Sequence, residues 1–170
     1  AKVVDKDVKL PEERQTSATT LEADTLEVLA DLNHASQKGL QTIFDSSVGR
    51  STVNHPLGGR YQITPTEASV QKLPVQHGVT TTASVMAQGF NPYVAEWSPY
   101  HGAAYAVIEA TARLVAAGAN WSKARFSYQE YFERMDKQAE RFGQPVSALL
   151  GSIEAQIQLG LPSIGGKDSM

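Results

Sequence analysis

The chain has 170 residues, of which 41% are hydrophobic and 19% are charged, so it is long and apolar enough for one globular domain with a core. It contains no cysteine, which excludes disulfides, thiolate metal sites and a cysteine nucleophile. The net charge of -3 gives no reason to expect a nucleic acid or an acidic membrane as a partner. No apolar run is long enough for a membrane span, and the first seven residues lack the apolar stretch of a signal peptide, so we expect a cytoplasmic protein.

The beginning of the chain reads as an arm followed by a helix and a loop. Residues 1–20 are polar and lack a usable period, so they are predicted to be a linker or arm that joins something upstream to a domain over residues 21–170. Leucines at three-residue steps from position 26 predict a helix over residues 24–38. Residues 45–62 are rich in turn formers and predict a long loop with room for one short strand.

Two elements are expected before residue 90. Thr64, Pro65 and Glu67 combine a hydroxyl cap, a proline at the first helical position and a capping-box acid, which predicts a short helix that ends at Pro74. Residues 79–85 are β-branched and lie between glycines, which predicts a strand.

The strongest helix signal starts at Ser98 and Pro99, where a hydroxyl cap again precedes a proline, and it ends at Gly118. Alanine dominates this segment, so its backbone can closely approach a sheet or another helix.

The last third of the chain predicts a short strand over residues 123–126 and two helices. The first helix starts at the capping box of Ser127 and Glu130 and runs through Arg141; the second covers residues 145–159 and stops at Gly160. Large apolar residues form one stripe on the second helix: Val146, Leu149, Leu150, Ile153 and Ile157. Several helices and few strands together predict an α+β fold.

The turn over residues 165–169, Gly-Gly-Lys-Asp-Ser, is the best candidate for phosphate chemistry. Glycines let backbone N–H groups converge on an anion, Lys167 neutralises it, and Asp168 with Ser169 could hold a bridging Mg²⁺. It is not a P-loop, because the spacing from Gly160 to Lys167 is one residue too long. The alternative is a polar turn after a strand.

Two further positions lie on the helix that follows Ser98. Glu109 is a candidate metal ligand, and the alternative is an ion pair with Arg113 four residues on. His101, in the first turn, could donate to a substrate oxygen as a neutral imidazole, and the alternative is a bond to nearby backbone.

Seven blocks of the sequence, in chain order, resemble the long single-chain form of the phosphoribosylformylglycinamidine synthases, the ligases of de novo purine biosynthesis. The blocks are residues 64–68, 72–74, 89–92, 98–109, 126–132, 149–151 and 165–170. The resemblance runs from about Leu26 to Met170 and matches the first domain of the second half of those enzymes. Each half is of the aminoimidazole-ribonucleotide-synthetase type, and a glutamine amidotransferase domain follows the second half.

The resemblance implies ATP- and glutamine-dependent conversion of formylglycinamide ribonucleotide to formylglycinamidine ribonucleotide in the parent protein. The glutaminase step needs a cysteine nucleophile, which this chain lacks. We therefore expect an inactive fragment without a catalytic residue of its own. The alternative is a free-standing structural or regulatory domain that pairs with a separate subunit and binds no nucleotide.

By position, the resemblance implies an auxiliary nucleotide site with ATP or ADP and Mg²⁺. Glu109 and Asp168 match metal-ligating acids. Residues expected to bind the nucleotide are Gly165, Gly166, Lys167, Ser169 and Arg113. Two positions depart from the family: His77 stands where some members have a metal-binding Asp, and Arg113 stands where an Asn lies. His77 and His101 are retained as candidates for substrate or interface contacts.

The implied fold is the N-terminal domain of the aminoimidazole-ribonucleotide-synthetase type, with a mixed four-stranded sheet backed by helices on one face. In the parent protein the partners are the first half and the glutaminase domain of the same polypeptide. An isolated copy would expose its sheet face, so the resemblance implies a homodimer through that face.

Overall fold

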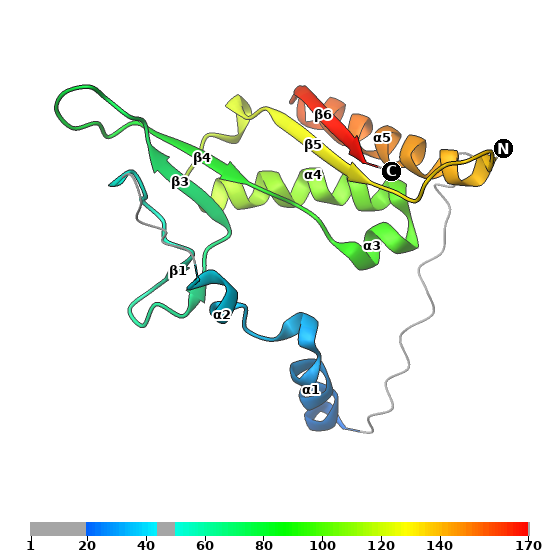
Figure 1. Ribbon diagram of the computed structural model, residues 1–170, viewed down its shortest axis with the longest axis horizontal. Helices are drawn as coiled ribbons and strands as arrows, with labels where there is room; N and C mark the ends of the chain where they lie inside the picture. The colour runs from blue at the N-terminus through cyan, green and yellow to red at the C-terminus, as the bar shows by residue number, and fades with distance from the viewer. Residues whose placement is uncertain (1–19, 44–49, 170) are drawn as a thin grey trace.

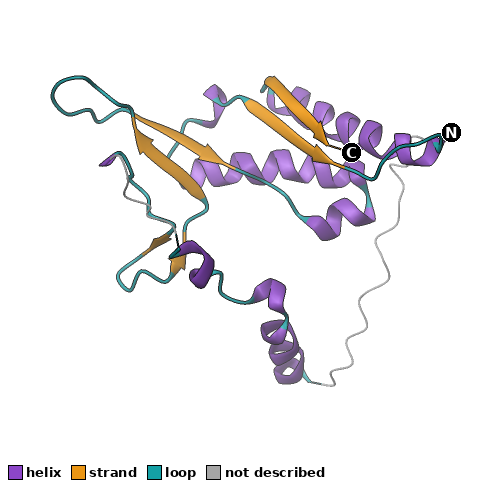
Figure 2. Ribbon diagram, viewed as in Figure 1, coloured by secondary structure: helices purple, strands orange, loops and turns teal. Residues whose placement is uncertain are grey.

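The computed structural model describes residues 20–43 and 50–169, and these form a mixed α+β structure (Figures 1 and 2). The α+β class predicted from the sequence is confirmed. Residues 1–19 of the predicted arm lie outside the described residues. In chain order the elements are α1 (Leu21–Ala30), η1 (Leu32–His34), α2 (Lys38–Gln41), β1 (Leu57–Gly58), β2 (Thr64–Pro65), β3 (Ala68–Lys72), β4 (Ala83–Ala87), α3 (Pro92–Trp97), α4 (Pro99–Ala116), η3 (Trp121–Lys123), β5 (Phe126–Tyr131), α5 (Ala139–Leu159) and β6 (Ser163–Ser169).

The body of the molecule is built on the long helices α4 and α5, which pack side by side (Figure 1). The parallel ladder of β5 and β6 contributes to the same core through β5. Val107 and Ala110 of α4, Phe126 of β5, Ala155 of α5 and Leu161 after α5 are buried together. The core therefore lies where β5 meets the two helices.

Small residues set the distance between α4 and α5. A Cβ atom on Gly151 would lie 2.0 Å from the carbonyl oxygen of Tyr100, so only glycine allows this approach. The Tyr100 hydroxyl donates a hydrogen bond to Glu154 across the same contact. The close approach expected of the alanine-rich helix therefore also needs a glycine on its partner.

The predicted ends of α4 are confirmed. The Ser98 hydroxyl accepts from the backbone N–H of His101 at 3.4 Å, and Pro99 occupies the first helical position. After the helix, Gly118 adopts a left-handed conformation with φ of 82°.

The prediction of a helix that starts at Thr64 is wrong. Thr64 and Pro65 form β2, and the following residues form β3, which pairs with β4 in an antiparallel hairpin. Ala68 and Val70 are buried while Ser69 between them is exposed, and this period of two is that of a strand. Cross-strand pairing therefore outweighs the local capping signals. The strand expected over residues 79–85 is present but begins later, at Ala83.

The prediction of a helix that starts at Ser127 is also wrong, because this residue lies in β5. Phe126, Tyr128 and Glu130 turn toward the body, and the residues between them are exposed, as in a strand. Helix α5 begins only at Ala139 and then continues without a break through Pro145 to Leu159. Pro145 lies in the second turn, where its missing N–H removes one intrahelical hydrogen bond.

The helix expected over residues 24–38 is interrupted after Ala30. Asp31 has an extended backbone, and its carboxylate accepts from the N–H of Asn33 at 2.9 Å, which caps a separate 3₁₀ turn. This part of the chain lies apart from the α4–α5 pair in Figure 1, so nothing in that pair holds it in one continuous helix.

The strands that the structure describes form three two-stranded ladders, β1–β2, β3–β4 and β5–β6. The single four-stranded sheet expected from the resemblance is not formed by these strands. In the described part of the chain, no helix is long and apolar enough to cross a membrane.

Candidate functional site

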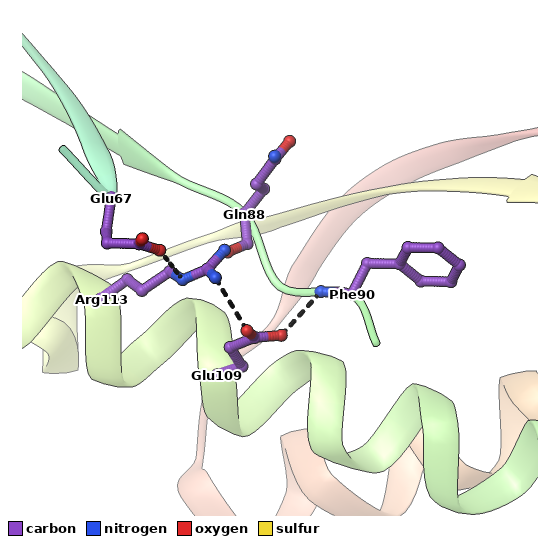
Figure 3. Close-up of polar contacts among 5 residues, drawn as sticks. All are labelled: Glu67, Gln88, Phe90, Glu109 and Arg113. Atoms are coloured by element: carbon purple, nitrogen blue, oxygen red, sulfur yellow. Dashed lines mark hydrogen bonds and ion pairs between the residues drawn. The ribbon is translucent and has the colours of Figure 1, made fainter. Parts of the chain in front are cut away.

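The side chains of Glu109 and Arg113 on α4 form the centre of a polar network (Figure 3). Arg113 Nη2 lies 2.9 Å from Glu109 Oε1, and Arg113 Nε lies 2.6 Å from Glu67 Oε2. The third guanidinium nitrogen, Nη1, donates to the Gln88 carbonyl oxygen at 2.8 Å. Phe90 closes the network, because its backbone N–H donates to Glu109 Oε2 at 2.8 Å.

This network joins three segments of the chain. Glu67 immediately precedes β3, Gln88 and Phe90 follow β4, and α4 supplies the other two residues. Arginine carries a planar guanidinium group with five N–H donors in fixed directions. Its side chain can therefore bind acceptors from three directions. The ion pair that was the alternative for Glu109 and Arg113 is therefore present, and it is part of a larger arrangement.

The network leaves little of either side chain for a ligand. Each nitrogen of the Arg113 guanidinium already contacts an acceptor, and both oxygens of Glu109 are engaged. A phosphate on Arg113 or a cation on Glu109 would first have to displace these partners. The sequence does not reveal Glu67 as a member, because its position after Thr64 and Pro65 is typical of a helix cap.

The residues expected to cradle a phosphate lie in a strand rather than a turn. Gly165 to Ser169 belong to β6, which pairs in parallel with β5. A register shift leaves one extra residue between Ser163 and Gly165, and Gly165 has a φ of 153°, as expected at a β-bulge. A Cβ on Gly166 would lie 3.1 Å from the Tyr128 carbonyl oxygen, so the close approach of the strands accounts for this glycine.

Lys167 and Ser169 share one face of the β5–β6 ladder. Lys167 Nζ donates to Ser169 Oγ at 2.7 Å, and Gln129 Nε2 donates to the same oxygen at 3.1 Å. Successive side chains in a strand point to opposite faces, so Asp168 turns away from this group. The structure therefore joins Lys167 with Ser169 but separates both from Asp168.

Asp168 lies opposite Glu130 in the ladder. Partial burial, and secondarily the negative charge of Asp168, raise the pKa of Glu130 above its ordinary value. Ionisation of Glu130 is thus disfavoured in the folded state, and this group destabilises the fold increasingly as pH rises through its pKa. The sequence does not reveal that Glu130 is a neighbour of Asp168, because the spacing of Ser127 and Glu130 is typical of a helix cap.

The two acids expected to bind Mg²⁺ lie on different elements and have different partners. Glu109 on α4 contacts Arg113 and Phe90, and Asp168 on β6 faces Glu130. Across residues 20–43 and 50–169, no three His, Cys, Asp or Glu side chains lie close enough together to hold a metal ion. Mg²⁺ bound to either acid would therefore take most of its oxygen ligands from water or phosphate.

His101 and His77 lie in contrasting surroundings. The His101 Nδ1 atom is 2.8 Å from the Ser98 hydroxyl, and its ring stacks on Trp97 with centroids 5.0 Å apart. A side-chain partner at the helix start thus replaces the backbone partner that was the alternative. His77 is exposed in the loop between β3 and β4.

A groove that the sequence does not predict lies beside the β3–β4 hairpin. It has a volume of about 310 Å³, and its walls are formed by uncharged residues. They are Thr52, Asn54, Pro56, Thr66, Ala68, Ser69 and Gln71. None of the expected nucleotide or metal residues belongs to it.

Comparison with protein-family models, with curated proteins and with solved structures gives no match.

Proposed function

We propose that this chain is one domain of a phosphoribosylformylglycinamidine synthase, an ATP-dependent amidoligase, and that it has no turnover alone. In the parent, ATP phosphorylates the carbonyl oxygen of the glycinamide group of formylglycinamide ribonucleotide, and ammonia from glutamine displaces phosphate to form the amidine. The chain contributes structure to this reaction rather than a reacting group. The resemblance of seven ordered sequence blocks is the observation that carries the proposal.

The contacts between these blocks support the proposal. Phe90, in the block over residues 89–92, bonds to Glu109 at the end of the block over residues 98–109. The block over residues 126–132 contains β5, and the block over residues 165–170 contains most of β6, its parallel partner. Residues that carry the resemblance thus contact one another, as expected if the pattern reflects one structural unit.

The described strands pair as separate two-stranded ladders, so they do not form the four-stranded sheet of the family fold. The ladders β3–β4 and β5–β6 nevertheless supply four strands between them. Strand β4 lies beside α4, and β5 shares a core with the same helix. One helix therefore contacts both ladders.

The residues of the predicted nucleotide site contact other groups of the chain. Lys167 and Ser169 form a polar pair on an exposed strand, while Arg113 and Glu109 are engaged elsewhere. This observation favours the second candidate function, a structural or regulatory domain that pairs with another subunit and binds no nucleotide. The two candidates differ in whether the chain alone binds ADP.

Thermal unfolding with ADP, with and without Mg²⁺, separates the two candidates. For the first we expect stabilisation of about 2.7 kcal/mol at a ligand concentration of about 100 times Kd, or roughly 5–10 °C. The shift should be lost in Lys167→Ala and kept in Lys123→Ala, an exposed lysine in η3. Loss in Asp168→Ala only when Mg²⁺ is present would assign a metal contact to Asp168.

The absence of any shift in the unmodified chain would favour the second candidate. An assay of ATP hydrolysis with formylglycinamide ribonucleotide and ammonia completes the test, because the proposal expects no turnover. Robust turnover would contradict the view that the chain lacks catalytic residues.

A further inference from the structure

Helix α5 has two apolar faces, and residues 20–43 and 50–169 cover only one of them. The covered face consists of small residues that pack toward α4 and β5, among them Ala148, Gly151 and Ala155. Its large residues lie on the other face. They are Phe142, Leu149, Leu150, Ile153 and Ile157, with exposed fractions of 57, 45, 43, 45 and 74%.

We call this set, together with the half-buried Val146, the α5 stripe. The stripe is the apolar periodicity that predicted the helix, yet the fold buries the opposite face. An amphipathic helix normally turns its large apolar residues toward the core, and a helix that is apolar on both faces is normally covered on both. The α5 stripe is therefore a contact surface.

The order of residues in the stripe identifies the partner. Its members lie symmetrically about the midpoint between Leu149 and Leu150. Phe142 is as far before this point as Ile157 is after it, and Val146 and Ile153 form a second symmetric pair. A pattern that reads the same from both ends matches itself in an antiparallel pair about a two-fold axis.

Charge along the helix favours the same partner. Between Phe142 and Leu159, Glu154 is the only charged residue, and its carboxylate accepts from the hydroxyl of Tyr100 in α4. Two copies could therefore approach through the stripe without placing like charges against each other. The open face of the β5–β6 ladder is less suitable, because it carries Gln129, Lys167 and Ser169.

We propose that two copies of this chain form a dimer in which the α5 stripes pack antiparallel across a two-fold axis. Leu149 of each copy faces Leu150 of the other, and Phe142 faces Ile157. Covering the five exposed side chains in both copies removes on the order of 1,000 Å² from solvent, the lower limit for a specific interface. We therefore expect a weak dimer with a Kd of about micromolar. This inference does not depend on the proposed function.

The register is tested by charge substitution, with sedimentation equilibrium of the full chain as the measurement. Leu149→Glu buries a carboxylate against an apolar partner twice per dimer, and should raise Kd more than about 100-fold. Adding Leu150→Lys to the same chain should restore most of the affinity, because each introduced carboxylate then faces an introduced ammonium. Tyr131→Glu on the β5–β6 ladder is the matched control and should leave Kd unchanged; Tyr131 is 86% exposed.

The fold of each variant is checked by circular dichroism. Should Leu149→Glu unfold the chain, Ile157→Asp provides a second test at a residue that is 74% exposed and that faces Phe142 of the other copy. A monomer at about 100 μM would overturn the proposal and leave the stripe to another polypeptide. A dimer that Tyr131→Glu disrupts and Leu149→Glu does not would assign the interface to the sheet. Failure of the Leu150→Lys rescue would overturn the antiparallel register.

Discussion

At the scale of single residues, Arg113 connects α4 to the segments on either side of the β3–β4 hairpin. Arg113→Ala would leave Glu67 and Glu109 without their shared cation, and we expect a loss of about 1–2 kcal/mol, limited by the partial exposure of the network. Arg113→Lys should recover only part of this loss, because one ammonium cannot reach three separate acceptors. Urea unfolding measures both effects.

Arg125 is the matched control for Arg113. It donates to the carbonyl oxygens of Lys123 and Ala124, which are its own chain neighbours. Arg125→Ala should therefore change the free energy of unfolding by less than about 0.5 kcal/mol. An equal loss in the two alanine variants would show that the Arg113 network adds nothing beyond an ordinary surface arginine.

At the scale of elements, two glycines of α5 differ in what surrounds them. Gly151→Ala places a Cβ against the Tyr100 backbone and forces α4 and α5 apart, at a cost of about 3 kcal/mol. Gly143→Ala meets nothing within 4 Å and should stabilise the helix by about 0.5–1 kcal/mol. Thermal unfolding of the two variants should therefore shift in opposite directions. A gain in stability from Gly151→Ala would contradict the close packing of the helices.

At the scale of the whole molecule, the proposed dimer links folding to concentration. Unfolding of a dimer to separate chains makes the melting temperature rise with protein concentration. We expect a rise of a few degrees between about 5 and 200 μM for the unmodified chain, and none for Leu149→Glu. Calorimetry at several concentrations measures this. A melting temperature that is independent of concentration would contradict the link.

The sequence by itself determined the elements whose signals are local. Ser98 with Pro99 begins α4 and Gly160 ends α5, because a cap or a left-handed glycine acts within one helical turn. Local signals failed for the helix expected from Thr64, where Ala68–Lys72 pair with Ala83–Ala87, and for the helix expected from Ser127, where that residue pairs with Gly165. Such pairing depends on contacts that no short window contains.

For the candidate site, the sequence determined the pair of Glu109 and Arg113, since residues four apart on a helix are neighbours. Only the tertiary structure decided that Glu67 and Phe90 join them, and that Lys167 and Asp168 lie on opposite faces of a ladder. It also decided which face of α5 is buried. The sequence marks both faces as apolar, but only the small one allows α4 to approach closely enough, so the large stripe is left exposed.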